Sequence, residues 1–112
     1  GFFIWSGNDA DTLPILSIGG YGVVSVASHL VGEEISRMIK LFTENDLVQS
    51  AKIHRDLMPL IEAIFYSTSP TPLKYMLNKI GISVGNPRPP LGEADDATKA
   101  QADQTLRSYN LI

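Results

Sequence analysis

Apolar and polar residues follow two different patterns along this chain, and the pattern changes near His29. Upstream of His29, two short and mostly apolar runs occupy residues 2–5 and 22–27, with a short helical pattern between them that ends at Gly19-Gly20. Runs of this kind are typical of parallel strands that are buried on both faces by helices and neighbouring strands. The first part of the chain is therefore predicted to form two strand–helix units.

Downstream of His29 the apolar residues recur at helical spacing almost to the C-terminus. Gly32-Glu33-Glu34 is expected to begin one helix, and Asp46 is expected to cap the N-terminus of the next. The apolar side chains of this second helix share one broad face, and Pro59 inside it predicts a kink. The face comprises Leu47, Val48, Ala51, His54, Leu57, Met58, Ile61, Ile64 and Phe65.

Proline and glycine mark the remaining boundaries. Thr71-Pro72 predicts an N-cap followed by a proline at the first helical position, and Gly81 predicts the end of that helix. Residues 83–93 contain three prolines and predict an extended connector. A last helix is expected from Ala94 onward.

These elements predict an α/β fold, with the last two strand–helix units of a (β/α)8 barrel (a TIM barrel) in residues 1–42 and a helical region in residues 43–112. A complete barrel takes about 250 residues, so a chain of 112 residues supplies less than half of one. Because the chain begins with Gly1 rather than Met, we expect a processed or truncated product. Its partners would then include the missing upstream barrel strands.

Composition narrows the classes of function. The formal net charge is −3, and acidic and basic side chains are mixed along the predicted helices, which argues against a nucleic-acid partner. The chain has no cysteine, so disulfides, thiolate nucleophiles and Cys-containing zinc sites are excluded. No apolar run approaches the roughly 18 residues that cross a bilayer. We expect a cytoplasmic segment with no membrane partner.

The turn Ser6-Gly7-Asn8-Asp9 is the first candidate for chemistry, because active sites of β/α barrels lie at the C-terminal ends of the strands. Glycine allows a ligand to approach the backbone, and Asn8 or Asp9 could orient a hydroxyl or aldehyde oxygen. In the competing interpretation Asn8 or Asp9 caps the following helix, and the spacing alone favours this structural role. Ser25 has no Gly-x-Ser-x-Gly surroundings, so it is not expected to be a nucleophile.

No catalytic residue is expected within this chain. A Schiff-base lysine needs a desolvated amine or a neighbouring cation, whereas every lysine falls on a predicted helix among polar neighbours, namely Lys40, Lys52, Lys74, Lys79 and Lys99. His29 is interpreted as a structural residue, and His54 has no second ligand at metal spacing. We therefore expect neither a metal site nor a cofactor.

Three groups of residues together resemble the dihydrodipicolinate synthase family. The first group comprises Trp5-Ser6-Gly7-Asn8-Asp9, Leu13-Pro14-Ile15-Leu16, Gly19-Gly20 and Gly22-Val23-Val24-Ser25-Val26-Ala27-Ser28. The second, Ser69-Pro70-Thr71-Pro72-Leu73-Lys74, is similar to the family's Asn-Pro-x-Pro-x-Lys segment. The third, Arg88-Pro89-Pro90-Leu91, is similar to its Arg-x-Pro-Leu segment. In order, they correspond to the C-terminal part of the family's subunit.

The resemblance implies a lyase of the class I aldolase type, which condenses pyruvate, held as a Schiff base, with aspartate semialdehyde in lysine and diaminopimelate biosynthesis. The family's Schiff-base lysine and its tyrosine and threonine proton relay precede this segment, so the chain alone is expected to be inactive. By position, the Val24 carbonyl would face the pyruvate adduct. Gly7 and Asn8 would border the aldehyde-substrate pocket, and Ser69 would lie near its rim. A homotetramer is also implied.

Two departures from the family pattern bear on substrate recognition, since Asn8 stands where an acidic residue is usual and Ser69 stands where asparagine is usual. A sister pyruvate-dependent aldolase, such as N-acetylneuraminate lyase, is an alternative, although residues 24–29 favour the synthase. A non-catalytic helical assembly module is a second alternative, against which the two apolar strands count. Unpaired strand edges predict that the free chain associates or folds poorly.

Overall fold

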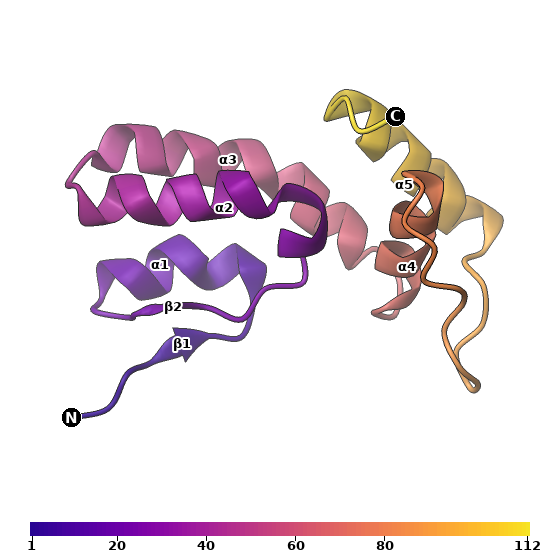
Figure 1. The fold of residues 1–112 in the computed structure, drawn as a ribbon, viewed down its shortest axis with the longest axis horizontal. Coiled ribbons are helices and arrows are strands. Elements are labelled where there is room, and N and C mark those ends of the chain that lie inside the picture. Colours follow the sequence, from indigo (N-terminus) through magenta and orange to yellow (C-terminus); the bar gives the residue numbers. More distant parts are fainter. The chain divides into compact units, whose positions relative to one another are not determined.

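The computed structural model describes residues 1–112 and contains two compact units, which we call unit 1 (Gly1–Met58) and unit 2 (Pro59–Ile112). The boundary between them falls inside helix α3 (Leu47–Ile64), so this helix contributes residues to both units (Figure 1). The boundary expected between residues 42 and 43 separates the barrel strand–helix units from the helical region, which is a different division, and it stays a prediction.

Unit 1 contains two short parallel strands, β1 (Trp5–Ser6) and β2 (Gly22–Val23), with Trp5 opposite Gly22 and Ser6 opposite Val23. Both strands lie within the predicted runs, but the regular pairing covers only two residues of each. Residues 2–5 are also exposed, from 89% at Phe2 to 51% at Trp5, whereas burial on both faces was expected. That expectation concerned a complete barrel, because such a run is buried only where neighbouring strands and helices cover it, and in this chain β1 pairs with β2 alone.

The connection between the strands is a 3-10 turn at Asp9–Asp11 followed by α1 (Thr12–Ser17), which packs on both strands (Figure 1). This segment ends at the predicted glycine pair. Gly19 has a φ of +99°, which L side chains rarely adopt, and a Cβ at Gly20 would lie 2.7 Å from the Ile15 carbonyl oxygen. The Gly20 N–H donates to that carbonyl at 2.8 Å. A glycine is therefore required at both positions for different reasons.

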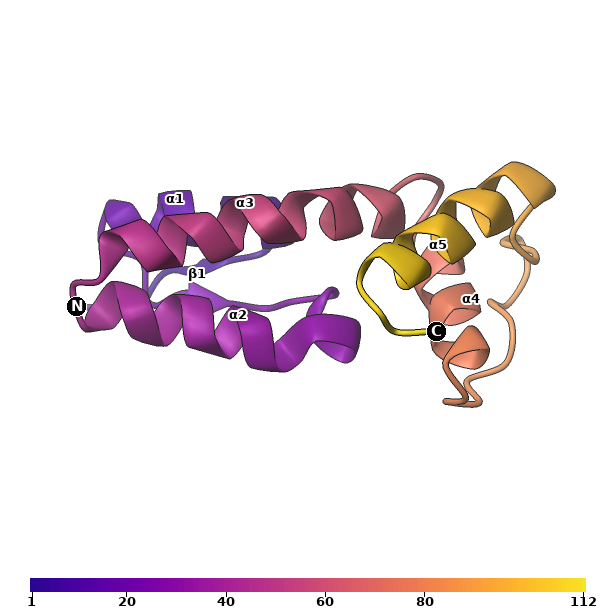
Figure 2. The same ribbon diagram turned by 90° about the horizontal axis from the view of Figure 1, so that it is seen from above.

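Helix α2 (Ser28–Thr43) and the first part of α3 lie side by side in unit 1, as Figures 1 and 2 both show. The backbone at Val31 is not helical, so the regular part of α2 begins at Gly32, as predicted. Asp46 Oδ1 accepts a hydrogen bond from the Gln49 N–H at 3.2 Å, which confirms the predicted N-cap of α3. The buried Ser50 hydroxyl donates to the Met38 carbonyl at 2.9 Å and joins the two helices.

The broad apolar face predicted for the second helix is buried only in part. Leu57, Ile61 and Ile64 are buried, but Leu47 and Val48 at the start of α3 and Phe65 just beyond its end are exposed. Periodicity identifies a face that can be buried and not the extent of the surface that covers it, so the apolar face extends beyond the buried surface at these ends. The helix continues through Pro59, as expected, and the kink there stays a prediction.

Besides the end of α3, unit 2 contains α4 (Thr71–Lys79) and α5 (Asp96–Ser108), which pack against each other. Met76 of α4 and Leu106 of α5 are completely buried. Gly81, at φ +95°, ends α4 as predicted, and the Ile82 N–H reaches back to the Leu77 carbonyl at 2.9 Å. The predicted Thr71 cap is wrong, because the Thr71 N–H already bonds the Thr68 carbonyl at 3.0 Å and Pro70 occupies the cap position.

Helix α5 begins two residues after the predicted Ala94, because Asp95 caps it by accepting a hydrogen bond from the Thr98 N–H at 2.8 Å. The connector before it is irregular, as predicted, and polar side chains of α4 hold it. Asn78 accepts from the Val84 N–H and donates to the Gly85 carbonyl, both at 2.9 Å. No helix in either unit is long and apolar enough to cross a bilayer.

Candidate functional site

The turn after β1 ends the strand pairing. The Val24 N–H donates to the Ser6 carbonyl at 2.9 Å, which continues the ladder one step past β2. In a regular parallel ladder the Asn8 N–H would next donate to the Val24 carbonyl. Instead it donates to the Ser6 hydroxyl at 3.2 Å, and that hydroxyl donates to the Asn8 carbonyl at 2.7 Å. The Val24 carbonyl therefore has no donor within the chain.

Asp9 connects this turn to the segment after β2. Its carboxylate accepts hydrogen bonds from the backbone N–H groups of Val26 and Ala27 at 3.0 and 3.1 Å, and from the Ser25 hydroxyl. The residue is only 3% exposed. A buried carboxylate is stable in such a place when strong donors satisfy its oxygens. Asp9 therefore fastens the two strand-end segments of unit 1 to each other.

The capping interpretation of this turn is wrong for both residues. Asn8 precedes the 3-10 turn without making a side-chain cap bond, and its Nδ2 donates to Asp11 Oδ2 at 3.0 Å. Asp9 bonds residues 16 to 18 positions away along the chain. The strand register could have indicated this, because pairing Ser6 with Val23 brings the residues that follow each strand together.

Three of the predicted site residues lie in unit 1, at the ends of the two paired strands, and the fourth, Ser69, lies in unit 2. Gly7 and Asn8 are exposed in the turn after β1, and Val24, 72% exposed, is the residue after β2. Ser69 is exposed just before α4, in the bend that Pro70 completes. Ser25 bonds Asp9 and also accepts from the Ser28 N–H at 2.9 Å, which agrees with a structural role.

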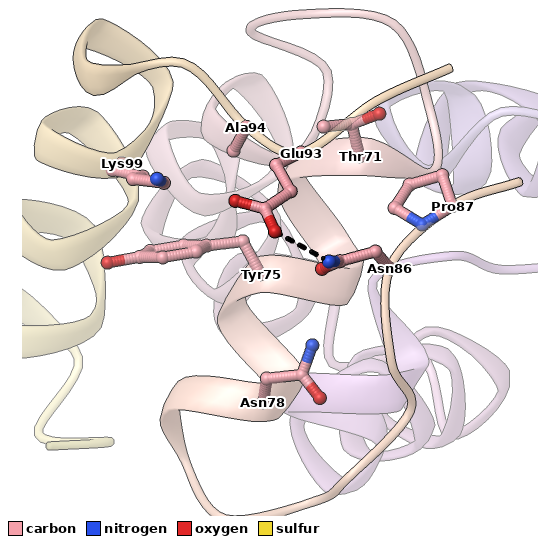
Figure 3. A pocket seen from close by; sticks show the side chains of 8 residues that line it. All are labelled: Thr71, Tyr75, Asn78, Asn86, Pro87, Glu93, Ala94 and Lys99. Atoms are coloured by element: carbon pink, nitrogen blue, oxygen red, sulfur yellow. Dashed lines mark hydrogen bonds between the residues drawn. The ribbon is translucent and has the colours of Figure 1, made fainter. Parts of the chain in front are cut away.

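Figure 3 shows a pocket of about 240 Å³ in unit 2, between α4, the connector and the start of α5. Asn86 Nδ2 donates to Glu93 Oε1 at 2.9 Å along its wall. Two of the three α4 side chains in the pocket are already engaged, since Asn78 holds the connector and the Tyr75 hydroxyl donates to Asp103 at 3.0 Å. None of the predicted site residues lines this pocket.

A second hollow of unit 2, of about 220 Å³, lies beside the Ser69 segment. Ser67 and Thr68 line it from one side, and Asp95 and Thr98 line it from the other. The Asp95–Thr98 hydrogen bond also holds the pKa of the Asp95 carboxyl below its usual value. The carboxylate is therefore committed to capping α5, which favours a structural role for this side of the hollow.

A comparison with protein-family models matches residues 1–109 to the dihydrodipicolinate synthetase family. The chain belongs to this family. The match covers both units and includes the Ser6–Asp9 turn, the β2 segment and the Ser69-Pro70 segment. Membership was expected from the three groups of residues described above, and it is confirmed.

Relatives in this family are considerably longer than the chain. It is 49% identical over 110 residues to the 4-hydroxy-tetrahydrodipicolinate synthase of Dehalococcoides mccartyi strain BAV1, and the match covers 98% of the chain and 37% of that protein. It is 50% identical over 103 residues to the synthase of Listeria monocytogenes, with 90% and 35% covered. The chain thus spans little more than a third of the curated relatives it matches.

Solved structures of the family share the fold. The dihydrodipicolinate synthase of Thermotoga maritima superimposes with a TM-score of 0.95 at 34% identity, and the enzyme of Cyanidioschyzon merolae, solved with lysine bound, does so with 0.95 at 42% identity. Each match covers 99% of the chain and 38% of the longer structure. The fold class is therefore confirmed as the C-terminal part of a (β/α)8 barrel with its helical extension. The roles of Gly7, Asn8, Val24 and Ser69 stay predictions.

Proposed function

We propose that this chain supplies the last strand–helix units of a dihydrodipicolinate synthase, a lyase that condenses pyruvate with aspartate semialdehyde. Pyruvate would be held as a Schiff base on a lysine outside these residues, and the chain by itself would be inactive. Family membership and the synthase names of the relatives support this proposal. We further propose that the complete protein is a cytoplasmic homotetramer, as is common in the family.

The observation that carries the proposal is the arrangement at the strand ends of unit 1. An unpaired Val24 carbonyl lies at the end of β2, and the exposed Gly7 and Asn8 lie at the end of the neighbouring β1. Catalytic sites of β/α barrels are built at this edge. In this arrangement the Val24 carbonyl accepts a hydrogen bond from the pyruvate adduct, and Gly7 and Asn8 border the aldehyde substrate. Ser69 of unit 2 is proposed as a further substrate-binding residue on the resemblance to the family alone.

The test uses a chimera in which the complete 112-residue chain replaces the matching C-terminal part of the Dehalococcoides mccartyi synthase. The chimera is incubated with pyruvate and borohydride, and its intact mass is measured. We expect one pyruvate adduct on the chimera and none on the 112-residue chain alone. A trapped adduct on the isolated chain would contradict the assignment, because it would place the nucleophile on one of its own helical lysines.

A second assay separates the synthase from the sister aldolases. The chimera is offered pyruvate with aspartate semialdehyde or with N-acetylmannosamine, and the condensation products are quantified. We expect product with the semialdehyde. Asn8 carries an uncharged amide in place of the usual acidic group, so the Asn8→Asp chimera is the matched control for substrate choice. Product with the sugar alone would identify the chain as part of an N-acetylneuraminate lyase-like enzyme.

A further inference from the structure

We propose that Asp9 is a positioning residue that fixes the Val24 carbonyl for the pyruvate adduct, an inference that rests on the proposed function. The carboxylate is 3% exposed and accepts three hydrogen bonds, all from the segment that follows Val24. Two of the three donors are backbone N–H groups, those of Val26 and Ala27. The side chain thus acts on the course of the backbone.

The backbone around Val24 is held on both sides. On its N-terminal side the Val24 N–H bonds the Ser6 carbonyl at 2.9 Å, and on its C-terminal side the Val26 N–H bonds Asp9 Oδ2 at 3.0 Å. The carbonyl between these two anchors has no donor of its own. A fixed dipole of this kind stabilises a bound group without the cost of reorganising at the moment of reaction.

Both anchors come from the turn after β1. Ser6 supplies the carbonyl that holds Val24, and its hydroxyl takes the Asn8 N–H that would otherwise pair with the Val24 carbonyl. Asp9, three residues after Ser6, supplies the second anchor. The spacing Ser6-Gly7-Asn8-Asp9 therefore both releases the Val24 carbonyl and holds it in place.

Asp9 itself is not placed to touch a substrate. Oδ1 accepts from the Ser25 hydroxyl, Oδ2 accepts from the two backbone N–H groups, and the residue is buried. Gly7 and Asn8 are the exposed members of the turn. Asp9 therefore acts through Val24. Its loss should weaken the binding of pyruvate more than the binding of the aldehyde substrate.

The experiment measures borohydride trapping of pyruvate in the chimera across a range of pyruvate concentrations, together with the thermal unfolding midpoint of each variant. Asp9→Ala removes all three hydrogen bonds, whereas Asp9→Asn keeps a carbonyl oxygen for the two backbone N–H groups. Ser25→Ala removes the hydroxyl contact with Asp9 and the acceptor of the Ser28 N–H, and it leaves both backbone hydrogen bonds to Asp9 in place. Glu34→Gln is the matched control, because Glu34 is an exposed carboxylate on α2 of the same unit.

If Asp9 positions Val24, the pyruvate concentration for half-maximal trapping rises about tenfold or more in Asp9→Ala. In Asp9→Asn this concentration stays within about threefold of the parent value, because the two backbone N–H groups keep an acceptor and Val24 is not displaced. In the Ser25 and Glu34 variants it stays near the parent value, because neither the backbone hydrogen bonds of Asp9 nor a buried charge is lost. The inference is overturned if Asp9→Ala lowers the unfolding midpoint but leaves half-saturation unchanged below it. It is also overturned if Asp9→Asn is as impaired as Asp9→Ala, because the charge would then be what matters.

The proposed function fails in a different way. If the parent chimera folds, with an unfolding midpoint near that of the Dehalococcoides synthase, and yet traps no pyruvate, the chain does not complete a pyruvate site. That result overturns the role of Asp9 together with the proposed function. Normal trapping in the parent with normal half-saturation in Asp9→Ala overturns the role of Asp9 alone.

Discussion

The Leu60 N–H donates a hydrogen bond to the Tyr109 hydroxyl, 49 residues later in the chain, at 3.3 Å. Leu60 follows Pro59, which lies inside α3 and has no N–H to donate to the helical hydrogen bonds. Leu60 is completely buried, so its N–H cannot be satisfied by bulk water. Tyr109, just beyond the end of α5, supplies an acceptor for this N–H from the other end of unit 2.

We therefore expect Tyr109→Phe to lower the free energy of unfolding of the chimera by about 1 kcal/mol, because a buried N–H loses its partner. Urea denaturation followed by circular dichroism would measure the change. Tyr66→Phe is the matched control, since Tyr66 is 55% exposed and its hydroxyl has no partner. Equal effects of the two substitutions would show that the Leu60–Tyr109 contact does not stabilise unit 2.

A second prediction concerns the connector between α4 and α5. Asn78→Ala removes the acceptor of the Val84 N–H and the donor to the Gly85 carbonyl together. We expect the Val84 amide to exchange its hydrogen at least about tenfold faster, because each lost bond contributes on the order of 1 kcal/mol to holding the loop closed. Hydrogen exchange read by mass spectrometry or NMR would test this. Asn45→Ala, in the exposed α2–α3 turn, should leave Val84 exchange unchanged.

A third prediction follows from the contacts between α4 and α5. Lys79 Nζ lies 3.1 Å from Asp103 Oδ2, and the Tyr75 hydroxyl donates to the same carboxylate. Partial burial alone would raise the pKa of Asp103, but the hydrogen bonds from Lys79 and Tyr75 outweigh it and lower the pKa. The hydrogen bond to Asp103, followed by that to Tyr75, raises the pKa of Lys79.

These shifts give two pH windows. The lowered pKa of Asp103 contributes stability above its unfolded value near pH 4, and this contribution disappears as the pH falls through the folded value. The raised pKa of Lys79 contributes below its unfolded value near pH 10, and this contribution disappears as the pH rises through the folded value. The measurement is the urea concentration at the unfolding midpoint of the chimera as a function of pH. We expect Asp103→Asn to reduce the fall of this midpoint at acid pH. In the control Asp96→Asn, at an exposed position, the fall of the midpoint at acid pH should be unchanged.

A fourth prediction concerns the chain in isolation. Residues 2–5 are exposed and apolar. The Tyr21 ring contacts that of Phe3 in a tilted arrangement and that of Trp5 edge to face, with centroids 4.4 and 5.0 Å away. An uncovered strand edge with apolar side chains favours association. We expect the 112-residue chain to sediment as oligomers, and Phe3→Glu to shift it toward the monomer. Val48→Glu, at an exposed apolar position on α3, is the control; a clean monomer of the parent would contradict the prediction.

The sequence predicted best the features that depend on a few consecutive residues. The stops at Gly19-Gly20 and Gly81, the cap at Asp46 and the start of regular helix at Gly32 follow from local backbone chemistry and are present in the structure. Strand length and burial could not be predicted in the same way. They depend on which segments cover residues 2–5, and that information is not contained in their own pattern.

The candidate site shows the same contrast. The place of residues 6–9 after an apolar run predicts a site at this turn. The part that Asp9 plays was missed, because its partners lie in another strand-end segment and become visible only once the register of β1 and β2 is known. Local capping rules assign each polar residue to its nearest helix, and Asp9 does not follow them.

The exposed apolar stretch that leads into β1 also has a consequence for the 112-residue chain in a cell. Short extended stretches of exposed aromatic and aliphatic residues are the surfaces that chaperones bind and that proteolytic quality control removes. The four residues at positions 2–5 form such a stretch. We therefore expect the steady-state amount of the 112-residue chain expressed alone to depend on how fast this stretch is captured as well as on the stability of the helices behind it.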